Sequence, residues 1–458
     1  MIAAEPKTTG QYQPYPEYKN TGLTWLGAIP NHWGLKMAKF VFKRVQRPVR
    51  VEDDIVTAFR DGQVTLRSNR RTEGFTNALQ EIGYQGVRSG DLLIHAMDGF
   101  AGAIGISDSE GKCSPVCSVC IPISAESVNP YYYGYLVRQL AVTGFITSLS
   151  KGIRERSTEF RFSEFSPLEL ALPPVDEQHI IAAFLDYETA RIDRLIAQQQ
   201  RLIELLKEKR QAVISHAVTK GLNPNAPMKD SGVEWLGQVP EHWIVRRLKH
   251  HIISMDQGWS PQCEARLAEE NEFGVMKVGC VNGGVFRFSE HKALPAELEP
   301  KTEYCLKKGQ LLVSRANTRE LVGSAAVVDA DYDQLLLCDK LYRIKLSSDA
   351  SPEFVALLLG TSAYRGQIEL SASGASDSMQ NIGQSTIKEL PIAVPPMDEA
   401  NDILKYVAAR LCTFDCLNNQ LQQQNLLLQE RRTALISAAV TGKIDLRGWT
   451  PPADEVAA

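Results

Sequence analysis

The chain has 458 residues, which is too many for one compact core and indicates two to four folded units. Hydrophobic content of 44% and charged content of 23% are ordinary for soluble globular proteins, and no apolar stretch approaches the roughly 18 residues of a membrane span. The net charge of −4 argues against a wholly basic surface but leaves room for a local basic face. The polar N-terminus has no signal-peptide pattern and the nine cysteines have no regular spacing, so we expect a cytoplasmic protein with free thiols.

A tryptophan-rich motif at residues 24–33 (TWLGAIPNHW) begins the first half of the chain. The stretch that follows, residues 36–71, holds ten basic side chains against four acidic ones. The basic residues are Lys36, Lys39, Lys43, Arg44, Arg47, Arg50, Arg60, Arg67, Arg70 and Arg71. This stretch is either a phosphate-binding face or an ordinary solvated surface, and composition alone does not decide between them.

The rest of the first body has the pattern of a mixed α/β domain. Residues 87–94 predict a turn into a strand, residues 117–123 a second strand, and residues 131–142 a helix, whose entrance we place at Asn129. The glycine-rich segment 105–113 resembles a phosphate-binding loop, but its spacing is wrong, and we interpret it as a hairpin turn.

Three cysteines in this body have a spacing used for iron–sulfur clusters. Cys113, Cys117 and Cys120 lie around Pro115 in a run that predicts a strand. Cys117 and Cys120 would then face opposite sides of the strand, so we interpret them as buried or half-buried thiols. The histidines are scattered, and we identify neither metal ligands nor a catalytic constellation.

Two segments predict long helices. Residues 175–220 and 397–441 contain neither glycine nor proline; each follows a Pro-Pro pair and an early aspartate and ends near Gly221 or Gly442. Apolar residues recur every seven positions in both, as in a helix that packs against another helix. The predicted seam consists of Leu185, Ile192, Leu195, Leu202, Leu206 and Val213 in the first helix and Val407, Phe414, Leu421, Leu428 and Leu435 in the second.

The simplest arrangement is an antiparallel coiled coil, in which about 44 residues span roughly 65 Å. Alternatively, each helix packs only on its own domain.

The two halves of the chain share a framework and differ in what it encloses. The motif of residues 24–33 returns at residues 234–243, and the helix ending of residues 206–219 returns at residues 428–441. Between these repeats the two bodies show little similarity. In the second body, residues 306–313 and 335–346 predict strands and residues 352–360 a helix, in the same order as in the first.

These motifs resemble the specificity subunits of Type I restriction–modification systems. The resemblance rests on Tyr15-Pro-Glu-Tyr-Lys19, on the two Trp-Leu-Gly-x-x-Pro-x-x-Trp motifs, and on Pro-Pro-x-Asp-Glu helices that end in Ile-Ser-x-Ala-Val-Thr, and it covers nearly the whole chain. One departure is Glu399-Ala400, where the first half has Glu177-Gln178. The resemblance implies an α+β fold with two α/β target recognition domains, separated by two long antiparallel helices and related by an internal two-fold pseudo-repeat.

On this basis we expect five segments. They are a first recognition domain at residues 1–172, a helix at 173–221, a second recognition domain at 222–394, a helix at 395–445 and a polar tail at 446–458. The resemblance also implies a non-catalytic subunit that reads a bipartite duplex DNA target, the first body reading the 5′ half and the second the 3′ half. Two adenine methyltransferase subunits and ATP-driven restriction subunits would be its partners, and these would hold S-adenosylmethionine, ATP and magnesium.

Two other functions stay open on the sequence. A methyltransferase or nuclease acting alone would need a cofactor loop or carboxylate cluster, which we do not find in the sequence. A coiled-coil adaptor without a DNA role would leave the basic stretch and the Arg- and Asn-rich loops unexplained.

Candidate DNA contacts follow from the chemistry of base edges, which are read mainly by Arg, Lys, Asn and Gln. The stretch at 150–162 lies opposite residues 372–384 under the offset of the helix repeat, and the two stretches differ in chemistry. In the first body the candidates are Arg67, Asn69, Arg70, Arg71, Lys151, Arg154 and Arg156. In the second body they are Arg315, Asn317, Arg319, Ser376, Ser378, Gln380 and Asn381.

Overall fold

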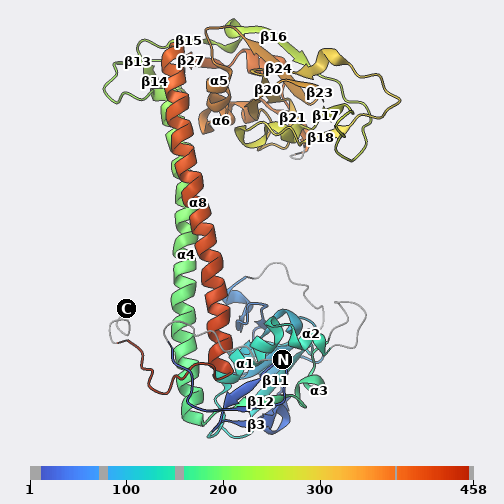
Figure 1. Cartoon of the computed structure of the whole chain (residues 1–458), viewed down its shortest axis with the longest axis vertical. Helices are drawn as coiled ribbons and strands as arrows, with labels where there is room; N and C mark the ends of the chain where they lie inside the picture. The colour runs from blue at the N-terminus through green and yellow to red at the C-terminus, as the bar shows by residue number, and fades with distance from the viewer. Residues whose placement is uncertain (1–11, 72–80, 150–158, 377–378, 453–458) are drawn as a thin grey trace. The chain divides into compact units, whose positions relative to one another are not determined.

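The computed structural model describes residues 12–71, 81–149, 159–376 and 379–452. The chain divides into two compact units, each of which joins one globular body to parts of two long helices (Figure 1). Unit 1 comprises residues 1–199 and 423–458, and unit 2 comprises residues 200–422. Among the described residues, no helix is both long and apolar enough to cross a membrane.

The body of unit 1 is built around a four-stranded antiparallel sheet of order β4-β11-β8-β9. Helix α1 packs against strand β9 of this sheet. The strands are β1 (Tyr18–Asn20), β2 (Ala28–Pro30), β3 (Gly34–Met37), β4 (Phe42–Val45), β5 (Val56–Ala58), β6 (Val64–Leu66), β7 (Gln85–Val87), β8 (Leu92–His95), β9 (Ile104–Ile106), β10 (Gly111–Cys113), β11 (Cys117–Pro122) and β12 (Glu169–Leu172). The helices are α1 (Pro130–Val142), α2 (Phe145–Ser148) and α3 (Phe162–Phe165).

The body of unit 2 contains a sheet of the same kind, with order β16-β24-β20-β22 and antiparallel pairing throughout. Its strands are β13 (Met228–Asp230), β14 (Gln238–Pro240), β15 (Ile244–Arg247), β16 (Ile252–Gln257), β17 (Gly274–Met276), β18 (His291–Ala293), β19 (Cys305–Leu306), β20 (Leu311–Ser314), β21 (Ala316–Asn317), β22 (Ala325–Val327), β23 (Tyr332–Leu336), β24 (Leu341–Leu346), β25 (Ser373–Ser376), β26 (Met379–Asn381) and β27 (Pro391–Val394). The helices are α5 (Pro352–Leu359), α6 (Ser362–Ser371) and α7 (Gln384–Lys388).

The two units repeat one strand arrangement. In each, a short hairpin (β1-β2, β13-β14) precedes the sheet, and the strand before the long helix pairs with the strand after the tryptophan motif (β12-β3, β27-β15). Two segments of the chain with little sequence similarity therefore adopt the same local topology.

Two details of the predicted strands are wrong. Residues 335–346 form two strands, because a turn at Asp339 and Lys340 separates β23 from β24. The segment 105–113 links β9 to β10 but is not a hairpin, since β9 pairs with β8 and β10 pairs with β7.

The interpretation of Asn129 and of the cysteines is confirmed. Asn129 caps α1, because its side chain accepts a 2.9 Å hydrogen bond from the Tyr131 amide. All nine cysteines are free thiols. Cys117 and Cys120 are buried in different hydrophobic clusters, as expected of residues three apart on one strand.

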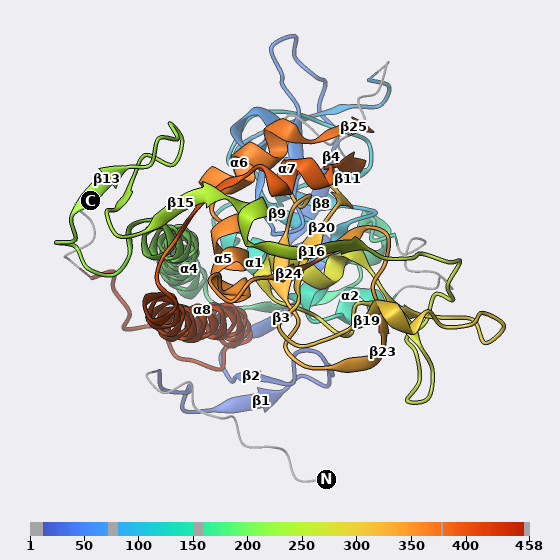
Figure 2. The same ribbon diagram turned by 90° about the horizontal axis from the view of Figure 1, so that it is seen from above.

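The two long helices are α4 (Val175–Lys220) and α8 (Met397–Val440), within one residue of the helices predicted at 175–220 and 397–441, whereas the wider helix segment expected at 395–445 runs five residues past the end of α8. Figure 1 shows them side by side in each unit, and Figure 2 shows them nearly end on. Along α4, positions with low exposure recur at alternating steps of four and three residues, as in a heptad repeat. These positions are 192, 196, 199, 203, 206, 210 and 213.

Two predicted seam residues do not belong to this line. Leu195 and Leu202 are 39% and 49% exposed, whereas Ile196 is half-buried and Ile203 is 5% exposed. In a heptad repeat, the second seam residue follows the first by either three or four positions. Both positions are apolar in α4, so the sequence alone does not distinguish them.

Polar contacts between the helices repeat from one unit to the other. In unit 1, Arg432 of α8 makes two bonds of 3.0 and 3.2 Å to Asp193 of α4. In unit 2, Arg210 of α4 pairs with Asp415 of α8, and these are the equivalent residues under the offset of the helix repeat. Both pairs place residues from opposite ends of the two helices together, so the helices run antiparallel within each unit.

The start of α4 is fixed by a buried carboxylate. Glu177 accepts hydrogen bonds from the Tyr15 hydroxyl (2.8 Å) and the Trp33 indole (2.9 Å), and its other oxygen lies 2.6 Å from His32 Nε2. Trp33 is fully buried. Burial, and then the bond to Glu177, raise the pKa of Tyr15 well above its usual value, so Tyr15 acts as a donor.

The end of α8 lies on the same tryptophan motif. Gly442 has a φ of 70°, and a Cβ there would come within 2.4 Å of Pro30 and 3.0 Å of Trp33. Glycine is therefore required by both conformation and space. Beyond it, Leu446 is buried and Trp449 packs edge-on against Phe184, so the first part of the predicted polar tail belongs to the core of unit 1.

Unit 2 repeats this arrangement with fewer bonds. His242 Nε2 lies 2.6 Å from Glu399, at the start of α8, and Gly221, at the end of α4, lies against Glu399 and Trp243. The buried indole nitrogen of Trp243, however, has no hydrogen-bond partner among the described residues, and the Glu399 side chain is 29% exposed. The second copy is therefore held less tightly than the first.

This difference predicts unequal effects of removing the two carboxylates. Glu177→Ala leaves three donors without an acceptor and should lower stability by about 3–5 kcal/mol, whereas Glu399→Ala should cost about 1 kcal/mol. Hydrogen exchange of backbone amides in the first turns of α4 and of α8, measured on the full chain, checks both values. Equal loss of protection at the two helix starts would contradict the assignment.

The seam predicts a second pair of unequal effects. Ile203→Ala removes a buried side chain and should cost about 2–4 kcal/mol, whereas Leu202→Ala, one residue away and exposed, should change stability by less than about 0.5 kcal/mol. Amide exchange in α4 and thermal unfolding measure both. If Leu202→Ala lowered stability more than Ile203→Ala, Leu202 would belong to the seam, as the sequence predicts.

Candidate nucleic-acid interface

The structure brings most of the candidate residues of unit 2 onto one small sheet. Strand β21 pairs with β26 and β26 pairs with β25, so that Asn317 lies opposite Gln380, Ala316 opposite Asn381, and Ser376 opposite Met379. These segments are about 60 residues apart in the sequence. The candidates from the two segments therefore share one place in the fold.

Residues directly opposite each other in an antiparallel pair point to the same side of the sheet. Asn317 and Gln380 are thus on one face, and Asn381 is on the other, with the buried Ala316. The two amides that we grouped from the sequence, Gln380 and Asn381, consequently face opposite ways.

Arg315 is held against the sheet. Its guanidinium donates a 3.3 Å hydrogen bond to the Asp339 carbonyl, its amide bonds to the Lys340 carbonyl, and its own carbonyl accepts from the Ile382 amide. Burial raises the pKa of Tyr342 beside it, and the Arg315 guanidinium opposes that rise. Arg319, by contrast, is exposed on the turn after β21.

The sequence reasoning missed Asn282, which lies in the turn Val278–Gly284. The side-chain NH2 group of Asn317 donates a 3.2 Å hydrogen bond to Oδ1 of Asn282. The Asn-Gly-Gly run predicts a turn, but nothing in the sequence places this turn beside β21.

In unit 1, three candidates lie beside the β5-β6 hairpin and are bonded to it. Arg67 donates to the Thr57 hydroxyl (3.0 Å) and Asn69 to the Thr65 hydroxyl (3.0 Å). Arg70 forms an ion pair of 2.5 Å with Asp61, which keeps the pKa of Asp61 below its usual value although burial acts to raise it. Arg71 is exposed at the end of this segment.

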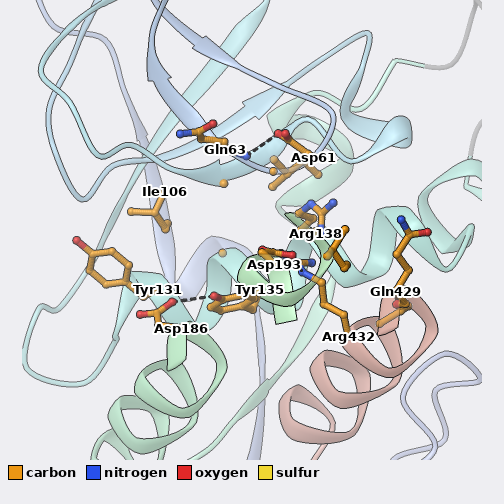
Figure 3. A pocket seen from close by; sticks show the side chains of 16 residues that line it. Asp61, Gln63, Ile106, Tyr131, Tyr135, Arg138, Asp186, Asp193, Gln429 and Arg432 are labelled. Atoms are coloured by element: carbon orange, nitrogen blue, oxygen red, sulfur yellow. Dashed lines mark hydrogen bonds and ion pairs between the residues drawn. The ribbon is translucent and has the colours of Figure 1, made fainter. Parts of the chain in front are cut away.

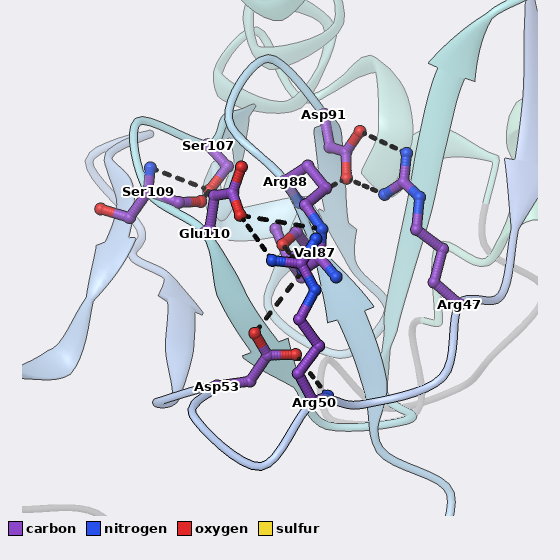
Figure 4. Close-up of polar contacts among 9 residues, drawn as sticks. All are labelled: Arg47, Arg50, Asp53, Val87, Arg88, Asp91, Ser107, Ser109 and Glu110. Atoms are coloured by element: carbon purple, nitrogen blue, oxygen red, sulfur yellow. Dashed lines mark hydrogen bonds and ion pairs between the residues drawn. The ribbon is translucent and has the colours of Figure 1, made fainter.

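The basic stretch of unit 1 is partly neutralised within the fold (Figure 4). Arg47 makes two bonds to Asp91, and Arg50 pairs with Glu110 at 3.1 Å. Arg60 and Arg70 also have carboxylate partners. Within the described part of this stretch, Lys36, Lys39, Lys43 and Arg44 are exposed and form no ion pair with an acidic side chain.

Several candidates cannot be placed. Lys151, Arg154, Arg156 and Ser378 lie outside the described residues, and Ser376 is described only through its position at the end of β25.

Unit 1 also contains a cavity of about 800 Å³ between its body and the long helices (Figure 3). Its charged side chains largely bond to one another or to neighbours: Tyr135 donates to Asp186 at 2.7 Å, and Arg432 binds Asp193. Burial raises the pKa of Asp186 and lowers that of Arg138, whose buried Nε has no hydrogen-bond partner within the described ranges. Acidic and basic groups mix in this cavity, so it has no uniform potential for a nucleic-acid backbone. No group of three or more His, Cys, Asp or Glu side chains suited to a metal ion occurs within the part of the chain that the structure describes.

No family model matches the chain. Among curated proteins, it is 28% identical to the Type I restriction enzyme EcoEI specificity subunit of Escherichia coli over 241 residues, which cover 52% of this chain and 40% of that relative. It is 23% identical to the EcoKI specificity subunit of Escherichia coli strain K12 over 442 residues, which cover 91% of this chain and 90% of that relative.

Solved structures share the fold. One from a study of complex assembly and conformational transition of the type I R-M system superposes with a TM-score of 0.67 at 15% identity and covers 90% of this chain and 98% of the other. The HsdS subunit from Thermoanaerobacter tengcongensis gives a TM-score of 0.54 at 16% identity, with coverage of 91% and 98%. The resemblance to Type I specificity subunits that the motifs indicate is confirmed.

Proposed function

We propose that this chain is the DNA-specificity subunit of a Type I restriction–modification complex. Each body reads one half of a bipartite duplex target, and the two long helices, paired as an antiparallel coiled coil, join the readers. The chain has no catalytic role of its own. Partner subunits hold S-adenosylmethionine for adenine methylation, and ATP and magnesium for restriction.

One observation carries the proposal: the same strand arrangement occurs twice and presents different polar groups. The sheets β4-β11-β8-β9 and β16-β24-β20-β22 correspond. The contacts of Glu177 and Glu399 with the histidines of their tryptophan motifs also correspond. The polar residues attached to this frame differ, being mainly arginines beside β5-β6 in unit 1 and mainly amides on β21-β26 in unit 2. A common frame with different contact residues suits one task performed on two different sequences.

The proposal predicts that the half-sites are read independently. The experiment uses the full chain together with its methyltransferase partner, and sequencing of methylated adenines gives the motif. Changing Gln380 and Asn381 together to Ala should relax one half-site and leave the other unchanged, because a bidentate amide contact contributes about 1–3 kcal/mol of discrimination. Arg154→Ala should relax the other half-site, or weaken binding at all sequences if this arginine contacts only phosphate.

Two controls decide this test. The chain without its partner should methylate nothing, and methylation by the pure chain alone would contradict a non-catalytic role. Loss of both half-sites in the Gln380 and Asn381 variant, when it still folds and binds the partner, would show that the bodies do not read separately.

The proposal also predicts that helix length sets the spacer. Gln199 and Gln424 are joined by a 3.2 Å hydrogen bond, so four residues inserted after each lengthen both helices at matching positions by about 6 Å. We expect a spacer longer by one or two base pairs of roughly 3.4 Å, with both half-sites kept. The methylated motif measures this, and altered half-sites with an unchanged spacer would contradict it.

A further inference from the structure

The turn that carries Asn282 brings a third amide to the small sheet of unit 2. Asn317 and Gln380 lie opposite each other on one face of β21 and β26, and Asn282 is bonded to the Asn317 side chain. The turn itself is firmly held, because Cys280 and Val281 are fully buried and Gly283 adopts a φ of 79° that favours glycine. Three amides from three separate segments therefore gather at one face.

The hydrogen bonds give these amides different roles. Both ends of the Asn317 side chain have partners: its Oδ1 accepts from the Thr318 amide at 2.9 Å, and its NH2 group donates to Asn282. Asn282 accepts through one lone pair of Oδ1, and its NH2 group has no protein partner among the described residues. Asn317 is thus bonded at both ends and keeps only one N–H and one lone pair, whereas Asn282 keeps its whole NH2 group and one further lone pair.

We propose that Asn282 is a base-reading residue of the second body and that Asn317 is the positioning residue that orients its amide. An amide with a free donor and a free acceptor matches the N7 acceptor and N6 donor of adenine in the major groove. The ligand of this site is thus an adenine of the half-site read by unit 2. This inference rests on the proposed function and adds to it a specific residue and base.

Asp at position 282 separates reading from positioning. Asn282→Asp keeps the oxygen that accepts from Asn317, so it preserves the bond between them, but it removes the NH2 donor. A carboxylate accepts from the N4 amino group of cytosine and offers no donor to adenine N7. Asn282→Ala removes both the reading group and the bond, and Asn419→Asp on the exposed surface of α8 is the matched control.

The experiment expresses each full-length variant with the methyltransferase partner and sequences methylated adenines at fixed salt. Asn282→Asp should change the preference at one base pair of one half-site from adenine toward cytosine. Asn282→Ala should lower discrimination at that base pair on the order of 10- to 100-fold. Asn317→Ala should relax the same base pair less strongly, and Asn419→Asp should leave the motif unchanged.

The results that overturn the inference are distinct from failure of the proposed function. If Asn282→Asp keeps the wild-type motif, with or without an effect of Asn282→Ala, Asn282 is not a reader. If Asn282→Asp changes the base preference in both half-sites, Asn282 does not read a base of one half-site, and the inference also fails. If the wild-type complex yields no bipartite motif, the proposed function itself is wrong. Thermal unfolding and partner binding show that each variant is folded, and Asn282→Asp, which keeps the bond to Asn317, serves where Asn282→Ala does not fold.

Discussion

The fold of unit 1 depends on a carboxylate, Glu177, that the tryptophan motif holds at the start of α4. Glu177 receives donors from three aromatic side chains, and it lies in the first turn of α4, where the helix dipole also favours a negative charge. The same motif receives the end of α8 at Gly442. One cluster thereby fixes the beginning of one helix and the end of the other, and the position of the body on both helices follows from it.

The second copy shows which parts of this cluster are needed. Tyr15 has no equivalent in unit 2, because Asn225 occupies the corresponding position, and the buried Trp243 indole has lost its acceptor. The histidine and glutamate contact remains in both. The contact between the motif and the helix start is thus common to the two units, whereas the additional bonds of Glu177 belong to unit 1 alone.

The sequence predicted the features that local chemistry determines. Both long helices, the cap at Asn129 and the opposite faces of Cys117 and Cys120 follow from spacing and from side-chain chemistry. The flank of the seam was misassigned because Leu195 and Ile196 are equally apolar, and only packing distinguishes them. The small sheet β21-β26-β25 does not follow from the sequence, which identifies Asn317 and Gln380 only as separate candidate contacts. Asn282 was not found, because its contact with Asn317 spans 35 residues and depends on tertiary folding.

The polar residues within the helical seam limit how the two helices align. In unit 1, Gln199 of α4 lies at a seam position. Gln199 Oε1 and Asn425 Oδ1 of α8 are both buried and have no hydrogen-bond partner in the part of the chain that the structure describes. A slide of one helix by seven residues would keep the apolar period, but it would move Asn425 to the level of Ile192 or Leu206 and leave the Gln199–Gln424 bond unmade. Each such mismatch costs on the order of 1–3 kcal/mol, so slipped alignments are disfavoured although the pair itself is less stable than an all-leucine seam. Substitutions at these seam positions should therefore be tolerated only when the facing residue of the other helix changes with them. The sequences of the two helices are thus constrained together at these positions.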